Sequence, residues 1–251
     1  MAADPTLKVV TTEGEKNFTV AELRKRLPIL TWTIQDPNFK KEKSFDGFSL
    51  QQVLELGGAS SDKGDELVFQ ALDGYSPTIS LEVASKHEAM IAFQEHGGKS
   101  QWQRIQQGKA WVSPAPFYVV WKEGKALPES FPWSYQLARI ELVSFQKKYA
   151  KLYPASLTKG SSEYKGFITF KERCLRCHSI NLQGGELAPE LNIPKNVTEY
   201  WSAADLKAFI LDATSYRLKS KMPVFKGSLS TAEIDDVVAY LKLMKANKIY
   251  N

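Results

Sequence analysis

Several features are scarce or missing in this sequence, and each absence narrows its function. No stretch approaches about 18 uninterrupted apolar residues, so a membrane-spanning helix is not expected. There is no internal repeat and no low-complexity tract. The lysines are scattered and no recognised nucleic-acid motif accompanies them, which argues against a nucleic-acid partner. Cysteine occurs only twice, at Cys174 and Cys177, and the first 150 residues contain none.

What is present indicates a folded protein of two domains. The chain has 251 residues, of which 43% are apolar and 24% charged, values typical of soluble proteins with a proper core. Residues 1–150 carry 18 basic and 18 acidic residues, whereas residues 151–251 carry 15 and 10 and hold the whole net charge of +5. The composition changes at a Pro/Ser/Gly-rich stretch, which predicts domains over 1–150 and 162–251 joined by a linker over 151–161.

The second half has helical signals throughout. Ser161 or Ser162 can cap a first helix that extends to Arg173. Ser202 and Ser230 each precede an acidic residue by three positions and then an apolar periodic run, which is the spacing of a capping box. No strand pattern interrupts these segments, so an all-α domain is expected.

The first half is predicted to be α+β. Strand patterns occur at 67–74, 78–83, 117–121 and 138–145, and short helices are expected at 19–27 and 49–58. An aromatic-rich run extends from Trp102 to Trp133 and includes Trp111. We interpret it as core, with a docking face for a redox enzyme as the alternative.

The two cysteines belong to the stretch Cys174-Leu175-Arg176-Cys177-His178, for which three explanations compete. A structural zinc site normally needs four protein ligands, and this stretch supplies at most three. A thioredoxin-like redox pair is expected beside a βαβ unit rather than in a helical domain. Covalent haem attachment explains all three residues, because two thiols a helical turn apart can each add to one vinyl group while the next imidazole reaches the iron.

From Ser162 to the end, the sequence resembles a class I c-type cytochrome. Gly166 and Phe170 match the small residue and aromatic of the family's first helix, and Tyr240 matches the aromatic of its last helix. Pro189, after a Gly-rich turn, stands where the family has a proline whose carbonyl oxygen accepts the N–H of the proximal histidine. The resemblance therefore implies haem c, one per chain, bound by Cys174, Cys177 and His178.

The same resemblance implies that Met222 is the distal iron ligand. Met222-Pro223 lies in a loop before the last helix, where such cytochromes supply a thioether, and Met/His ligation suits electron transfer. Met244 fits the apolar stripe of the last helix and Met90 fits a buried position, so both are interpreted as core. The metal ligands are thus His178 and Met222. Arg217, Lys219 and Lys221 flank the loop and are assigned to haem propionates, to an acidic partner, or simply to solvent.

The first half resembles the molybdopterin-binding domain of the sulfite-oxidase family. The residues that carry the likeness are Gly47, Leu50, Leu54, Asp73, Gly74, Tyr75, Ala92 and Gly97. In that family a cysteine holds the molybdenum, and this half has none, which argues against bound molybdopterin. His87 and His96 lie nine residues apart without an obvious third ligand, so no metal site is assigned to them. We expect a scaffold, a small-ligand binder or a partner-docking module.

Together these features predict an exported mono-haem electron carrier. Ala2-Ala3-Asp4-Pro5 resembles the new end left after removal of a signal peptide, with Met1 added, and the alternative is a cytosolic protein that begins at Met1. The resemblance to c-type cytochromes, which mature outside the cytoplasmic membrane in bacteria, implies the periplasm. The expected partners are redox proteins, and the positive charge of the second half is assigned either to docking on an acidic partner or to a solvated charged face. The alternatives are a haem-containing oxidoreductase, or a subunit of one, that acts on a small substrate at the first domain, and a gas sensor in which Met222 dissociates.

Overall fold

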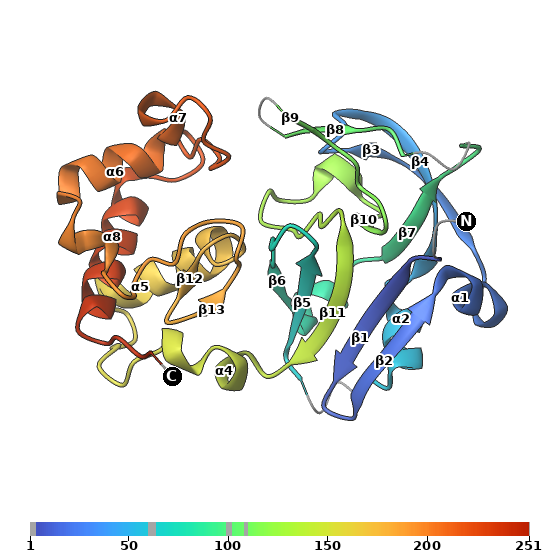
Figure 1. The fold of residues 1–251 in the computed structure, drawn as a ribbon, viewed down its shortest axis with the longest axis horizontal. Coiled ribbons are helices and arrows are strands. Elements are labelled where there is room, and N and C mark those ends of the chain that lie inside the picture. The colour runs from blue at the N-terminus through green and yellow to red at the C-terminus, as the bar shows by residue number, and fades with distance from the viewer. Residues whose placement is uncertain (1–3, 60–63, 99–101, 108–109, 251) are drawn as a thin grey trace. The chain divides into compact units, whose positions relative to one another are not determined.

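The computed structural model describes residues 4–59, 64–98, 102–107 and 110–250, and it divides the chain into two compact units (Figure 1). The first comprises Met1–Gln106 and Ala110–Phe145, and the second consists chiefly of Gln146–Asn251. The segment 151–161 that we expected to form a linker contains the buried side chains of Leu152 and Leu157.

The first unit is rich in sheet, as its strand patterns predicted. One sheet has the order β2-β1-β11-β5-β6 and the other the order β10-β7-β4-β3, and a short pair, β8–β9, lies outside both. The strands of the first sheet are β1 (Thr6–Thr11), β2 (Gly14–Thr19), β5 (Glu66–Ala71), β6 (Thr78–Ser80) and β11 (Leu137–Val143). The others are β3 (Leu30–Asp36), β4 (Lys41–Ser49), β7 (Ala89–Glu95), β8 (Ile105–Gln107), β9 (Ala110–Val112) and β10 (Tyr118–Trp121).

Four short helical segments accompany these strands, namely α1 (Val20–Arg26), α2 (Leu50–Gly57), α3 (Leu81–Ala84) and the 3-10 turn η1 (Gly124–Ala126). The predicted strand over 78–83 ends early. Ser80 caps α3 instead, since its hydroxyl accepts a hydrogen bond from the backbone N–H of Val83 (3.2 Å). The helix expected over 49–58 is confirmed, and it ends at Gly58, which has a positive φ of 85°.

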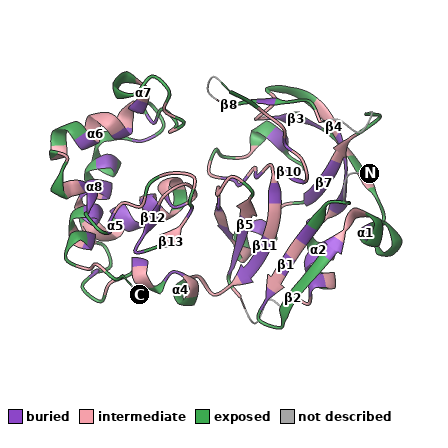
Figure 2. Ribbon diagram, in the orientation of Figure 1, coloured by how far each residue is buried: buried purple, intermediate pink, exposed green. Residues whose placement is uncertain are grey.

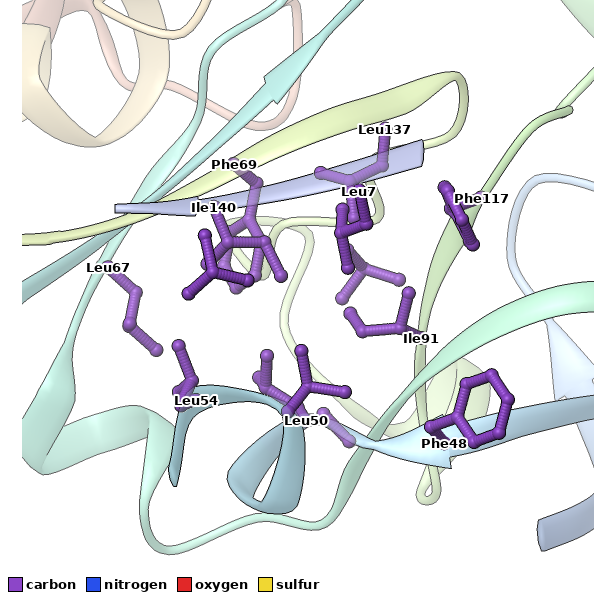
Figure 3. Packing of buried hydrophobic residues seen from close by; sticks show 14 of the residues in the cluster. Leu7, Phe48, Leu50, Leu54, Leu67, Phe69, Ile91, Phe117, Leu137 and Ile140 are labelled. Atoms are coloured by element: carbon purple, nitrogen blue, oxygen red, sulfur yellow. The ribbon is translucent and has the colours of Figure 1, made fainter. Parts of the chain in front are cut away.

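The main core of this unit lies between the two sheets and α2 (Figure 3). Leu7 and Ile140 come from the first sheet, Ile91 from the second, and Leu50 and Leu54 from α2. Strand alternation gives the second sheet another buried face, because successive side chains point to opposite sides. That face carries Ile34, Phe45, Met90, Ala92, Tyr118 and Val120.

The aromatic run from Trp102 to Trp133 is only partly core. Phe117, Tyr118 and Trp121 are completely buried, and Phe131 nearly so. Trp111 contradicts the prediction, because 57% of its surface is exposed. It lies in β9, which pairs with β8, and within the described part of the chain neither strand joins one of the larger sheets.

The second unit is helical around a small core. Its helices are α5 (Ser162–Thr169), α6 (Ala203–Leu211), α7 (Ala213–Tyr216) and α8 (Thr231–Lys245), together with the π turn η3 (Phe170–Cys174) and the 3-10 turns η2 (Ala150–Leu152) and η4 (Val197–Glu199). The short helix α4 (Phe145–Lys148) spans the boundary between the units. Among the described residues, the all-α expectation is met apart from a minimal ladder of β12 (Ser179–Ile180) and β13 (Gln183–Gly184) and an isolated bridge between Lys226 and Leu229.

Helices α5 and α8 pack closely, and a glycine allows the approach. A Cβ atom at Gly166 would lie 1.9 Å from the carbonyl oxygen of Asp236 in α8. The ring of Tyr240 then packs on Phe167 and Phe170, with centroids 5.7 and 5.5 Å away. This is the contact expected from the resemblance to class I c-type cytochromes.

Figure 2 colours the buried residues of each unit purple.

Candidate functional site

The stretch with both cysteines forms a turn that continues the first helix of the second unit. The Ser161 hydroxyl caps α5 by accepting a hydrogen bond from Tyr164 N (3.1 Å). The helix then widens into a π turn, in which Leu175 N donates to Phe170 O at 2.8 Å, a feature often found at functional sites. Cys177 N and His178 N both donate to Cys174 O, at 3.0 and 2.9 Å. The two thiols therefore belong to residues one helical turn apart.

Two glycines let the chain return closely over this turn. A Cβ atom at Gly184, where φ is +140°, would lie 2.3 Å from His178 O, and one at Gly185 would lie 2.3 Å from Arg176 O. The returning chain also holds the turn by hydrogen bonds, since Gly185 N donates to Leu175 O (2.8 Å). Side chains other than hydrogen would push the two segments apart. The Gly-rich turn seen in the sequence therefore allows residues 184–185 to pack closely against the backbone of the Cys-x-x-Cys-His turn.

His178 is oriented by the backbone. Its Nδ1 lies 2.7 Å from the carbonyl oxygen of Pro189. A carbonyl can only accept, so Nδ1 carries the proton and Nε2 keeps its lone pair. Burial lowers the pKa of His178, against opposing effects of the Pro189 hydrogen bond and the Glu190 charge. A neutral imidazole with a held Nδ1–H is the form in which histidine binds a metal.

The side chains of Cys174 and Cys177 are half-buried. In the described part of the chain, neither cysteine forms a disulfide. Burial first, and the neighbouring Cys177 second, raise the pKa of the Cys174 thiol to about 12. Redox-active cysteines have a lowered thiol pKa, because the thiolate is the reactive form. The environment of Cys174 is therefore not that of an activated, nucleophilic thiol.

The Met222 loop connects α7 with α8 (Figure 1). Met222 is half-buried, and its backbone N–H donates to the Ser220 hydroxyl (3.2 Å). Apolar side chains beside it are open to solvent, with Leu218 81% and Val224 49% exposed. The loop thus combines a thioether with solvent-exposed apolar residues, a composition that fits contact with a haem face.

The sequence-predicted residues fall into two groups. The structure brings Cys174, Cys177, His178 and Pro189 together at one turn, whereas Met222 lies in a separate loop of the same unit. Met244 and Met90 are completely buried, which confirms their interpretation as core.

The two histidines of the first unit each pair with a carboxylate. His87 Nδ1 lies 2.8 Å from Glu123 Oε1, and His96 Nδ1 lies 2.8 Å from Asp46 Oδ1. Among the residues that the structure describes, no group of three or more His, Cys, Asp or Glu side chains is placed to hold a metal.

Sequence reasoning missed a set of polar residues beside the histidine turn. Asn181, Asn192 and Asn196 have no exposed surface, and they form a continuous chain of hydrogen bonds together with the carboxylate of Glu190. Asparagine and glutamate in a loop are ordinarily solvent-exposed, so composition gave no signal. Only their closeness in sequence to His178 and Pro189 could have drawn attention to them.

A helical unit whose Cys-x-x-Cys-His turn holds its histidine by a proline carbonyl has the features of a cytochrome c domain. Comparison with known proteins gives the same class. Residues 163–241 match the family model described as cytochrome c oxidase, cbb3-type, subunit III. The chain therefore contains a C-terminal cytochrome c domain, which implies haem c, redox partners and a haem-based role in electron transfer.

The family match ends within the second unit and covers less than half of the chain. The likeness of the first unit to the sulfite-oxidase molybdopterin domain stays a prediction. Within the described ranges, no helix has both the length and the apolar character needed to cross a bilayer.

Proposed function

We propose that this protein is a periplasmic mono-haem c-type cytochrome that passes single electrons between redox partners. Its first domain would serve as a docking or ligand-binding module. The observation that carries the proposal is the 2.7 Å hydrogen bond from His178 Nδ1 to Pro189 O, because it leaves Nε2 available beside the two thiols. The periplasmic location follows from the resemblance, since bacterial c-type maturation takes place outside the cytoplasmic membrane.

The roles of the individual residues follow from their chemistry. Cys174 and Cys177 would hold the haem through thioethers, His178 Nε2 would bind one face of the iron, and the Met222 thioether would bind the other. The bound haem supplies a one-electron couple between ferrous and ferric iron. Pro189 O keeps the imidazole in one tautomer and one orientation. With both His178 and Met222 bound, the iron would have no open position, which would favour electron transfer over chemistry on a bound substrate.

Exposed cations beside the Met222 loop support an acidic redox partner. Arg217, Lys219 and Lys221 are all exposed, and the second half of the chain carries the whole positive excess. Such a patch speeds encounter with an acidic surface and loses its effect as salt increases. Charge reversal at Lys219 and Lys221 should therefore slow electron transfer to an acidic partner at low salt and much less at high salt.

One set of spectra tests the haem assignment. The oxidised wild-type protein should show a weak band near the red end of the spectrum, which Met–iron ligation gives, and its pigment should stay with the polypeptide after acid–acetone extraction. Met222→Ala should remove the band and let the reduced protein bind carbon monoxide. Met244→Leu is the matched control, because this buried methionine is replaced at nearly constant volume and should keep the band.

The outcomes separate the parts of the proposal. A colourless mature protein, or pigment released into organic solvent, would contradict covalent haem. A Met222→Ala protein with an unchanged red-end band would contradict only the distal ligand.

A second candidate is a haem-containing oxidoreductase that acts on a small substrate at the first domain. A pocket in this unit with a volume of about 180 Å³ favours it. Its lining includes Lys40, Lys41 and Arg104 together with the exposed indole of Trp111. Cations beside an aromatic ring suit a small anionic, partly apolar ligand.

Metal analysis and turnover distinguish this candidate from the carrier. Stoichiometric molybdenum or another metal besides iron, or reduction of the haem by a small anion that Arg104→Ala abolishes, would favour the enzyme. Iron alone, with reduction only by protein donors, would favour the carrier.

A further inference from the structure

Glu190, the residue directly after Pro189, forms an unusually complete set of hydrogen bonds. Its half-buried carboxylate accepts from four backbone N–H groups. Oε1 accepts from Asn181 (3.0 Å), Asn192 (2.8 Å) and Ile193 (3.2 Å), and Oε2 accepts from Leu182 (3.1 Å). Bonds to an ionised acceptor are stronger than those between neutral groups. One side chain therefore satisfies four amides, two in the turn between β12 and β13 and two just after Pro189.

The four amides belong to two segments that follow the two partners of the histidine hydrogen bond. Residues 181–182 follow β12, only three residues beyond His178, and residues 192–193 come shortly after Pro189. The carboxylate fastens these segments to each other. The Pro189 carbonyl, which belongs to the peptide unit just before Glu190, is therefore held at a fixed position opposite His178 Nδ1.

Buried asparagine side chains join the same two segments to α8 and the residues after it by hydrogen bonds. Asn192 Nδ2 donates to Asn181 Oδ1 (2.7 Å), and Asn196 Nδ2 donates to Asn192 Oδ1 (2.7 Å) and to Leu241 O in α8 (2.9 Å). Asn181 Nδ2 donates to Asn247 O (2.9 Å) beyond the end of α8. A satisfied buried network of this kind permits one arrangement and resists others. The carboxylate of Glu190 therefore cannot shift without breaking several bonds.

We propose that Glu190 is a positioning residue for the iron-binding histidine, acting through the Pro189 carbonyl. The inference rests on the proposed function, in which His178 binds the haem iron. Glu190 has two consequences there. It fixes the rotation of the imidazole about its bond to iron, and it places a negative charge near that imidazole, which favours the more positive ferric state and lowers the reduction potential.

The test compares two variants of the haem-loaded full-length protein. Glu190→Gln keeps the size of the side chain, removes its charge and turns an amide NH₂ toward backbone N–H groups. Glu186→Gln is the matched control, because this exposed residue of the same loop loses the same formal charge. The reduction potential of Glu190→Gln should rise, and by more than that of Glu186→Gln. The difference should persist at high salt, because exposed charges are screened and half-buried ones less so.

Spectroscopy of the ferric protein supplies the second readout. Because imidazole rotation changes the anisotropy of low-spin iron, Glu190→Gln should alter the electron paramagnetic resonance g values, whereas Glu186→Gln should not. Glu190→Asp keeps the charge on a shorter side chain, and it should bring the potential back toward that of the wild type.

Several results would overturn the inference. Equal potentials and g values in Glu190→Gln and Glu186→Gln, with only a loss of stability in the former, would reduce Glu190 to a structural role. If the Glu190→Gln protein does not incorporate haem, hydrogen exchange of the wild-type protein tests whether the Glu190 carboxylate holds the four amides. Slow exchange at the amides of 181, 182, 192 and 193 supports the arrangement, and exchange at the rate of exposed amides refutes it. Absence of haem in the wild type would instead contradict the proposed function.

Discussion

Replacement of Gly166 by alanine tests the packing that supports the histidine turn. An ideal Cβ at this position would lie 1.9 Å from the carbonyl oxygen of Asp236 and 2.9 Å from Cβ of Tyr240. The nearest obstacle is backbone, which cannot rotate away as the end of a flexible side chain can. Helices α5 and α8 would have to separate, and the ring of Tyr240 would lose contact with Phe170, which has no exposed surface.

Opposing effects set the size of the loss. Overpacking a core costs about 1–3 kcal/mol, and a clash with rigid backbone belongs at the upper end of that range. Alanine recovers up to about 1 kcal/mol, because glycine is the poorer residue inside a helix. We therefore expect the free energy of unfolding of the second unit to fall by about 2 kcal/mol.

Denaturant titration of the haem-loaded protein measures this loss. Haem absorption follows the second unit, and far-UV circular dichroism follows the whole chain. Lys165→Ala is the control, since Lys165 is the exposed neighbour of Gly166 on α5 and its truncation should change stability by less than about 0.5 kcal/mol. If Gly166→Ala were as stable as Lys165→Ala, the close approach of α5 and α8 would be refuted.

Three further predictions use the same titrations. Tyr240→Phe removes the buried 2.8 Å hydrogen bond to Leu152 O and should destabilise the second unit by about 1–2 kcal/mol, whereas Tyr250→Phe, at an exposed position, should have almost no effect. Asn192→Ala breaks the buried amide chain and should cost about 2–4 kcal/mol; a loss below about 1 kcal/mol would show that the chain contributes little. In the first unit, burial raises the pKa of Asp36 despite its bonds from Phe39 N, Tyr118 and Asn38 N, so the folded state binds the proton more tightly than the unfolded state. Asp36 should therefore lower stability as pH rises from its usual pKa of about 3.9 through the raised value. The stability of the wild type relative to Asp36→Asn should decrease as pH rises above about 4, and a constant difference would contradict the shift.

Local patterns in the sequence determined much of the second unit. Ser230 and Glu233 predicted the capping box at the start of α8, which the structure contains in full. Ser202 predicted the start of α6, although Asp205 there bonds to the Ser202 hydroxyl rather than to the backbone. Each of these signals acts over three or four residues, so the sequence alone can specify it. The cysteines and the histidine are informative for the same reason, because haem attachment requires these residue types at this short spacing.

Tertiary structure decided the features that depend on distant segments. β1 pairs in parallel with β11, and no local pattern in either strand identifies its partner. Trp111 is apolar in sequence yet exposed, because coverage of an indole depends on which strands reach it. Glu190 is an ordinary loop carboxylate in sequence, and it becomes a binding site for four amides only when residues 181–182 and 192–193 meet. Short-range signals fix where elements begin and end, whereas hydrogen bonds and packing across the chain fix which of them meet.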